Sequence, residues 1–231
     1  MGIIETGIKA IDNSLVNGLT KEKITIIQGP TAGGKTMSLL NITLNSSVEG
    51  KNVLFLSQEM TAFALQKQIA RVISGSWDID RDKVKNYIED NENIGDITVK
   101  NVSFSDNLNE IRDSINRYVE LKKIDVVLID FLPTLDKDDT FYNPRKYVEY
   151  LIDFNRSIDI PIILTKNVLR DEINTRFVTN FETRNIRFDY FNIFTLHGLS
   201  QEDEIKTYDI LFNDEVIEET ITFNLKTLNI K

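Results

Sequence analysis

Residues 29–36 read GPTAGGKT, that is Gly29, Pro30, Thr31, Ala32, Gly33, Gly34, Lys35 and Thr36. The spacing is G-x-x-x-x-G-K-S/T, the pattern of a phosphate-binding loop that joins a strand to a helix. The flanking sequence fits, because the apolar run Lys23–Gln28 precedes the loop and a helical pattern over Lys35–Ser47 follows it. We therefore expect the loop to follow a buried strand and to open the first core helix.

Each residue type in this loop has a chemical reason. Glycines let the backbone curl so that amide N–H groups point inward, and the helix N-terminus adds partial positive charge where phosphates sit. Lys35 can reach the β- and γ-phosphate oxygens of ATP, and the Thr36 hydroxyl can bind Mg²⁺. The alternative is a glycine-rich turn with a chance lysine, and the strand–loop–helix context argues against it.

Two carboxylates are candidates to complete the chemistry. Asp130 follows the aliphatic strand Asp125–Ile129 and is expected to support the metal, directly or through water. Glu59 lies just beyond the strand Asn52–Ser57, at the sheet edge where open α/β sheets bind ligands. A carboxylate there can polarise the attacking water. The alternatives are a strand-end cap for Asp130 and a solvated residue at a helix start for Glu59.

The remaining pattern predicts one α/β domain over residues 1–231. Helices are predicted from caps at about Thr61 and Asp106, over about Asp80–Glu92, and from Pro144. Further strands are predicted at Asp96–Val102, Ile160–Thr165, Phe191–Leu196, Lys206–Phe212 and Val216–Leu225. The alternation implies a mostly parallel twisted sheet flanked by helices, with antiparallel C-terminal strands. Trp77 and the aromatic residues outside the arginine-rich segment described below are expected in the core.

The composition excludes several classes of protein. A chain of 231 residues with 41% hydrophobic residues can bury one domain core. It has no cysteine, which excludes disulfides and thiolate metal sites, and its single histidine, His197, excludes multi-histidine metal sites. The formal net charge of −9 argues against a broadly basic nucleic-acid coat. Without a signal pattern or an apolar run of about 18 residues, we expect a cytoplasmic protein with no membrane partner.

Several segments resemble the ATPase domain of DnaB-type replicative helicases, within the RecA-like superfamily. The matches are residues 6–12 (TGIKAID, family T-G-f-x-x-l-D), 54–60 (LFLSQEM, family L-F-x-S-L-E-M), 128–132 (LIDFL, family v-I-D-Y-L) and 160–170 (IPIILTKNVLR, family V-P-v-i-a-l-s-Q-L-s-R). The likeness covers nearly the whole chain. It implies a RecA-like P-loop fold, ATP and Mg²⁺ as cofactors, and the role of the catalytic glutamate for Glu59.

The resemblance also assigns residues beyond the phosphate loop. Asn167 stands where the family has a glutamine that senses the γ-phosphate, and it carries the same amide on a shorter arm. Residues 181–186 (FETRNI) resemble R-E-S-G-x-I, a DNA-contacting loop of the family. The surrounding segment carries Arg170, Arg176, Arg184 and Arg187 interleaved with phenylalanines, which suits binding of single-stranded DNA. The alternative is a solvated loop whose phenylalanines pack on the sheet.

Two departures from the family pattern affect the expected activity. The family reaches its neighbour's ATP site with an arginine from a K-x-R segment, where this chain has Asn213, Asp214 and Glu215. An arginine finger contributes about 10³–10⁵ in rate, so a homo-oligomer should turn ATP over slowly unless Lys206 or another cation substitutes. The family's N-terminal domain and linker are also expected to be absent, because Gly2 stands almost at the ATPase opening.

Three functions follow as hypotheses. The first is an ATP-binding and ATP-hydrolysing DnaB-type helicase-like protein, oligomeric, that acts on single-stranded DNA in replication or recombination. The second is an ATP-binding accessory module without a finger, which docks on a helicase or another replication protein. The third is a RecA-type recombinase-like filament or ring ATPase, and the pattern at Ser57–Met60 argues against it.

Overall fold

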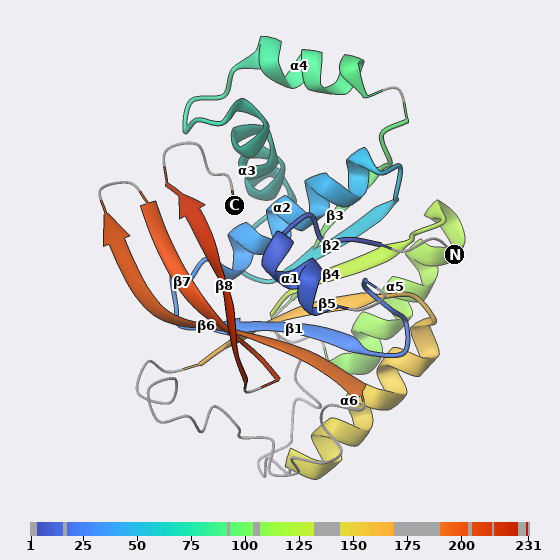
Figure 1. Ribbon diagram of the computed structural model, residues 1–231. Coiled ribbons are helices and arrows are strands. Elements are labelled where there is room, and N and C mark those ends of the chain that lie inside the picture. Colours follow the sequence, from blue (N-terminus) through green and yellow to red (C-terminus); the bar gives the residue numbers. More distant parts are fainter. Residues whose placement is uncertain are drawn as a thin grey trace.

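The computed structural model describes residues 4–15, 18–91, 93–103, 107–131, 144–168, 190–202, 205–213, 215–225 and 230. Helices flank both faces of a twisted sheet (Figure 1). The helices are α1 (Lys9–Ser14), α2 (Lys35–Val48), α3 (Ala62–Ser74), α4 (Arg81–Asp90), α5 (Leu108–Lys122) and α6 (Pro144–Ile158). The strands are β1 (Ile24–Gly29), β2 (Val53–Ser57), β3 (Ile97–Asn101), β4 (Val126–Asp130), β5 (Ile162–Asn167), β6 (Phe191–Glu202), β7 (Ile205–Phe212) and β8 (Glu215–Asn224).

The strands lie in the order β3-β2-β4-β5-β1-β6-β7-β8. All neighbours from β3 to β6 pair in parallel, whereas β6–β7 and β7–β8 pair antiparallel. The predicted fold class is therefore confirmed. Strand β6 continues to Glu202, beyond the predicted end at Leu196, because its polar second half still has β7 to pair with after a register shift between His197 and Ser200.

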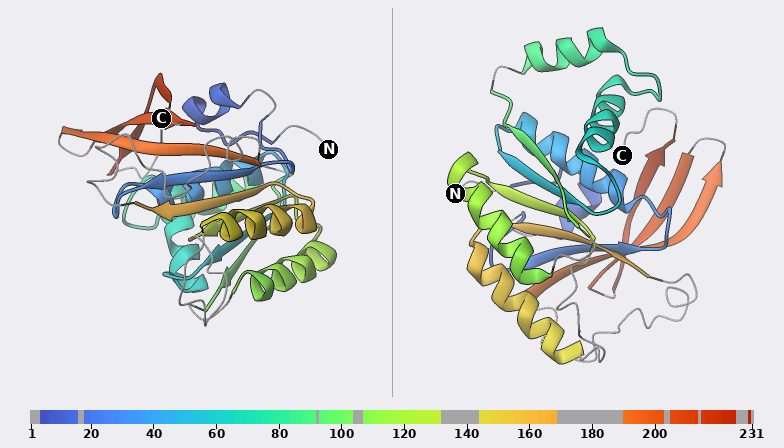
Figure 2. Two further views of the ribbon diagram at one scale, coloured as in Figure 1. Left: turned by 90° about the horizontal axis from the view of Figure 1, so that it is seen from below. Right: turned by 180° about the vertical axis from the view of Figure 1, so that it is seen from behind.

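The central strands are buried on both faces, which explains their continuous aliphatic sequence. In β4, for example, Leu128 packs in one apolar cluster with side chains of α1, α2 and α3. Its neighbours Val127 and Ile129 pack in a second cluster with α5 and α6. Figure 2 shows these two groups of helices on opposite faces of the sheet. Each fully buried aliphatic side chain contributes about 1.5–3 kcal/mol, so the two clusters hold the central strands in place.

Helix starts follow local capping chemistry. Thr61 caps α3 as predicted, because its hydroxyl accepts a hydrogen bond from the Ala64 N–H at 3.2 Å. The predicted cap of α5 at Asp106 is wrong, since Asn107 caps this helix. Asn107 accepts from the Glu110 N–H, and the Glu110 carboxylate accepts from the Asn107 N–H at 2.8 Å. The glutamate stands at the third position after Asn107, which completes the reciprocal capping box.

The expectation that Trp77 belongs to the core is also wrong. Its side chain is 54% exposed, and Phe63 on α3 is 77% exposed. Trp77 lies between α3 and α4, where the Arg71 guanidinium stands 5.2 Å from the centre of its ring. Its indole N–H donates to the carbonyl of Leu225, just after β8, at 3.0 Å. The polar N–H and the cationic partner together place the ring at the surface rather than in an apolar cluster.

Among the described residues, none of the helices combines the length and the apolar character that a membrane span requires.

Candidate nucleotide-binding site

The sheet order brings the predicted site residues to one edge. Strands β2, β4, β5 and β1 are consecutive neighbours and all run in parallel, so their carboxyl ends meet. Ser57 at the end of β2 pairs with Asp130 at the end of β4, and Gly29 pairs with Asn167 at the ends of β1 and β5. The loop after each strand therefore faces the same space, as the edge rule for open α/β sheets requires.

The phosphate loop adopts a conformation that requires glycine at two positions. Gly34 has φ +84°, in the left-handed region. A Cβ on Gly33 would stand 2.6 Å from the Pro30 carbonyl oxygen, which already accepts the Gly33 N–H at 2.9 Å. The loop is thus a tight curl that ends at the first turn of α2, where unpaired N–H groups make a site for anions.

A cavity of about 660 Å³ opens above this loop. That volume lies in the usual range for small-molecule sites. Its lining includes Thr31, Ala32, Gly33, Gly34, Lys35, Thr36, Glu59, Asp130 and Asn167 from the predicted set. Gly29 and Pro30 are not in the lining, and instead their carbonyl oxygens accept hydrogen bonds from the Lys35 ammonium at 3.2 and 2.7 Å. The sequence-predicted residues described by the structure therefore converge on one cavity and its floor.

Lys35 is a buried cation at the floor of this cavity, with 8% of its surface exposed. Burial lowers its pKa from 10.5, and the negative charges of Asp130 and Glu59 partly oppose that shift. A buried ammonium is stabilised by any further anion placed next to it. The lysine is therefore suited to hold phosphate oxygens.

Asp130 is the second buried charge, 6% exposed, and both of its carboxylate oxygens accept hydrogen bonds. The Thr36 hydroxyl donates to Oδ2 at 2.8 Å and the Thr165 hydroxyl donates to Oδ1 at 3.0 Å. Burial raises the pKa of Asp130 above 3.8, and these two hydrogen bonds oppose the shift. The nearby charge of Glu59 raises the pKa of Asp130 further.

The Thr36 and Asp130 oxygens also fit a magnesium ion. Their hydrogen bond of 2.8 Å places a hydroxyl and a carboxylate oxygen side by side, and both are oxygen ligands of the kind that Mg²⁺ takes. Within the described parts of the chain, no cluster of three or more acidic or histidine side chains could hold a metal by itself. The pair therefore fits a cation that takes its other ligands from water and phosphate, as Mg²⁺ does in nucleotide sites.

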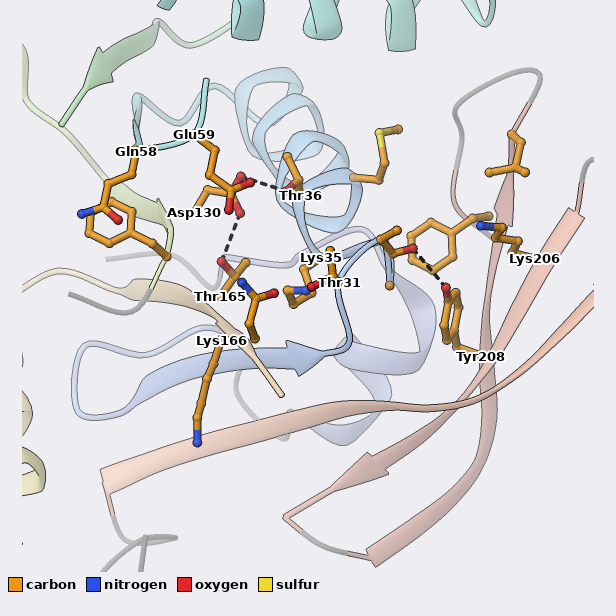
Figure 3. A pocket seen from close by; sticks show the side chains of 18 of the residues that line it. Thr31, Lys35, Thr36, Gln58, Glu59, Asp130, Thr165, Lys166, Lys206 and Tyr208 are labelled. Carbon is orange, nitrogen blue, oxygen red and sulfur yellow. Dashed lines mark hydrogen bonds between the residues drawn. The ribbon is translucent and has the colours of Figure 1, made fainter. Parts of the chain in front are cut away.

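Glu59 lies in the turn after β2, with an exposed side chain that lines the cavity. Its carboxylate lies beside that of Asp130 and opposite Thr36 in Figure 3. The turn is held at both ends, because the Asn101 amide donates to the carbonyls of Ser57 at 3.0 Å and Met60 at 2.9 Å. The Met60 N–H also donates to the Ser57 hydroxyl at 3.1 Å. A carboxylate held above bound phosphates can orient a water molecule.

Of the other predicted residues, some line the cavity and some lie outside the described residues. Asn167, at the end of β5, lines the cavity with an exposed side chain. Arg170, Arg176, Arg184 and Arg187 lie outside the described residues, and so does Asp214. Lys206, considered above as a substitute for the missing arginine, lines the cavity of its own chain (Figure 3).

Sequence reasoning missed the aromatic side of the cavity, which comes from β7 and β8. The Tyr208 hydroxyl donates to the Ala32 carbonyl at 3.4 Å, and the Phe223 ring packs against Gly34. Tyr208 and Phe223 meet edge to face, with ring centres 5.5 Å apart. No local pattern marks these contacts. Thr165 was also missed, although it is a polar residue at the end of an apolar run on β5.

The comparisons with known proteins agree with this geometry. The family described as the DnaB-like helicase C terminal domain matches residues 3–176. One similar solved structure is a DnaB-like replicative helicase, reported with its interactions with primase, at TM-score 0.74 and 17% identity. The alignment covers 98% of this chain and 62% of that one, so the present chain spans less than two thirds of that helicase.

A second similar structure is an isolated ATPase domain, at TM-score 0.73 and 18% identity. That alignment covers 99% of this chain and 92% of the other. No curated protein sequence matches the chain. At these identities the solved structures support the RecA-like fold, whereas the family match extends over most of the sequence. The chain therefore belongs to the family of the DnaB-like helicase C-terminal domain, a family of helicase ATPases.

Proposed function

We propose that residues 1–231 act as one ATPase domain that binds ATP with Mg²⁺ in the cavity above residues 29–36 and hydrolyses it. The observation that carries the proposal is the convergence of one buried cation, one hydroxyl and two carboxylates on a cavity at the start of α2. This set contains the parts that phosphoryl transfer to water needs, namely a phosphate cradle, a metal-supporting acid and an acid that orients water.

Each residue has a separate task in this proposal. The loop N–H groups and Lys35 hold the β- and γ-phosphates, and Thr36 and Asp130 would hold Mg²⁺. When bound, Mg²⁺ supplies positive charge that offsets the charge of the phosphate oxygens. Glu59 accepts a hydrogen bond from the attacking water and aligns it with the γ-phosphate. Asn167 contacts the γ-phosphate through its amide and so distinguishes ATP from ADP.

The biological setting that we propose is replication or recombination on single-stranded DNA. The family membership supports a helicase motor. The arginines 170, 176, 184 and 187 supply cations that would bind the DNA strand. The proposed partners are further copies of the chain, a helicase or another replication protein. Primase is a partner of the similar replicative helicase.

A second candidate is an accessory module that binds ATP without turning it over. The charge pattern around the β7–β8 turn favours it, because Asp214 and Glu215 stand where the family has a cation that reaches the neighbouring subunit. Lys206 lines the cavity of its own chain, which argues against that role for Lys206 in the neighbour. This candidate and the motor make opposite predictions for ATP turnover.

Steady-state ATP turnover separates the two candidates. We would measure phosphate release with and without single-stranded DNA for the wild type, for Glu59→Gln and for Glu120→Gln, an exposed glutamate on α5 used as the control. For a motor, DNA stimulates turnover, Glu59→Gln lowers it by at least about 100-fold, and Glu120→Gln leaves it unchanged. Nucleotide binding with no turnover in the wild type would favour the accessory module.

A further inference from the structure

Thr165 lies at the inner edge of the proposed site, where its hydroxyl is buried. It follows three buried apolar residues, Ile162 to Leu164, on a central strand and is itself 3% exposed. A buried hydroxyl without a partner is unfavourable by about 1–3 kcal/mol on protein scales. Its partner is Asp130 Oδ1, at 3.0 Å in a buried hydrogen bond.

The two hydroxyls that hold Asp130 come from different parts of the fold. Thr36 belongs to the first turn of α2 and is itself one of the proposed metal ligands. Thr165 belongs to β5, which is paired on both sides, with β1 and β4. The Thr165 bond therefore ties one carboxylate oxygen to a central strand of the sheet, and the other oxygen faces Thr36 at the start of α2.

We propose that Thr165 is a positioning residue for Asp130. Its hydroxyl fixes Oδ1 and so presents Oδ2 to a divalent cation next to Thr36. The inference rests on the proposed function, because it concerns the metal of the nucleotide complex. Without the Thr165 hydroxyl, Oδ1 loses its donor, and the carboxylate can rotate away from its place next to Thr36.

The expected size of the effect comes from metal sites in general. Removing a partner that orients a metal ligand typically lowers metal affinity by about 10–100-fold. Thr165→Val removes the hydroxyl but keeps the branched shape that suits a strand. Thr165→Ser keeps the hydroxyl and removes a methyl group. The matched control is Thr43→Val on α2, a buried threonine whose hydroxyl donates only to the Leu39 carbonyl of its own helix at 2.8 Å.

The experiment is calorimetric titration with a non-hydrolysable ATP analogue, in the presence of Mg²⁺ and in the presence of EDTA. For each variant, the dissociation constant in EDTA divided by the dissociation constant in Mg²⁺ measures the contribution of the metal to binding, independently of turnover. We expect the wild type, Thr165→Ser and Thr43→Val to show a similar ratio. We expect Thr165→Val to lower that ratio by about tenfold. Its dissociation constant in EDTA should stay within about twofold of the wild-type value.

The outcomes separate this inference from the proposed function. If Thr165→Val keeps the wild-type ratio, the positioning role is wrong and the nucleotide site stands. If Thr165→Val weakens binding equally with Mg²⁺ and with EDTA and Thr165→Ser does not restore it, the threonine acts in packing and the positioning role is again wrong. A wild type that binds no nucleotide, or binds it without help from Mg²⁺, overturns the proposed function and the inference together.

Discussion

At the scale of single residues, the site contains two buried charges, those of Lys35 and Asp130. Lys35 has a lowered pKa and Asp130 a raised pKa, and burial is the largest cause in both cases. Burial therefore makes the charged form of each side chain less favourable in the folded protein than in the unfolded chain. Nucleotide and metal bound as proposed would relieve this cost and would link the stability of the domain to its ligand.

The first prediction concerns Asp130→Asn without nucleotide or metal. The folded-state pKa of Asp130 lies above its unfolded value, so stability rises as the pH falls through the folded pKa and the ionised form is destabilising at pH 7. We expect Asp130→Asn to raise Tm at pH 7 by a few degrees, since 1 kcal/mol corresponds to about 2–4 °C at this chain length. The advantage should shrink as the pH is lowered through that pKa.

Thermal unfolding followed by circular dichroism between pH 4 and pH 8 measures this effect. The control is Asp78→Asn, an exposed aspartate in the connection between α3 and α4, for which we expect no rise in Tm at pH 7. A lower Tm for Asp130→Asn than for wild type at pH 7 would contradict the account of a strained buried carboxylate.

At the scale of elements, the phosphate loop is supported by the C-terminal hairpin of β7 and β8. Phe223 is 5% exposed, and a Cβ on Gly34 would stand 2.5 Å from its Cζ atom. Tyr208 holds the Ala32 carbonyl from the same side. The loop conformation therefore depends on two strands that lie far along the chain as well as on its own glycines.

A double-mutant cycle tests this support. Gly34→Ala combines strain at φ +84° with a clash against Phe223, and Phe223→Ala removes the ring at a cost of about 3–5 kcal/mol. In the double variant the clash is gone. We therefore expect its loss in the free energy of unfolding, measured in urea, to be smaller than the sum of the two single losses by about 0.5–3 kcal/mol. Gly50→Ala has similar strain, at φ +77° at the opposite end of α2, and should be additive with Phe223→Ala. If the losses of Gly34→Ala and Phe223→Ala also add, the proposed contact between residue 34 and Phe223 is wrong.

The connection between α3 and α4 supplies an optical signal for the site. Trp77 is the only tryptophan of the chain, and its indole N–H binds the carbonyl of Leu225, which lines the cavity. We expect nucleotide binding to change its fluorescence along a saturable curve that matches calorimetry, and Lys35→Ala to abolish the change. Constant emission during binding that calorimetry detects would show that Leu225 does not respond to the ligand.

The same elements show what the sequence predicts and what it does not. The loop and Glu59 come just after predicted strands and Asp130 comes at the end of one, so the sequence could predict these residues as parts of the site. The aromatic side could not be predicted, because Tyr208 meets Ala32 across 176 positions and no local pattern encodes such a contact. The cap at Asn107 could have been predicted from Glu110, the third residue after it. The surface position of Trp77 could not be predicted from neighbouring residues, because its indole N–H binds Leu225, just after β8.

At the scale of the whole molecule, the charge decides how DNA can be bound. A chain with a net charge of −9 repels a polyanion at long range, so binding requires a local cluster of cations. The arginines 170, 176, 184 and 187 are the candidates from sequence. Their contribution should be electrostatic and should weaken as salt is added.

The double variant Arg184→Ala/Arg187→Ala tests this assignment. If each arginine contacts one phosphate, the slope of log affinity against log salt for single-stranded DNA should become shallower by about 1.4. The control is Arg117→Ala/Arg156→Ala, with exposed arginines on α5 and α6, which should leave the slope unchanged. Fluorescence anisotropy of a labelled oligonucleotide gives both slopes. An unchanged slope for the first pair would remove these arginines from the DNA site.

The central claim is that a triphosphate sits on residues 29–36 with Glu59 and Asp130 facing it. A crystal structure of the wild type grown with Mg²⁺ and a non-hydrolysable ATP analogue tests it most directly. We predict phosphates on the loop, a metal bound next to Thr36 and Asp130, and the Glu59 carboxylate directed at a water beside the γ-phosphate. An analogue bound elsewhere, or an empty loop at a saturating concentration, would contradict the account.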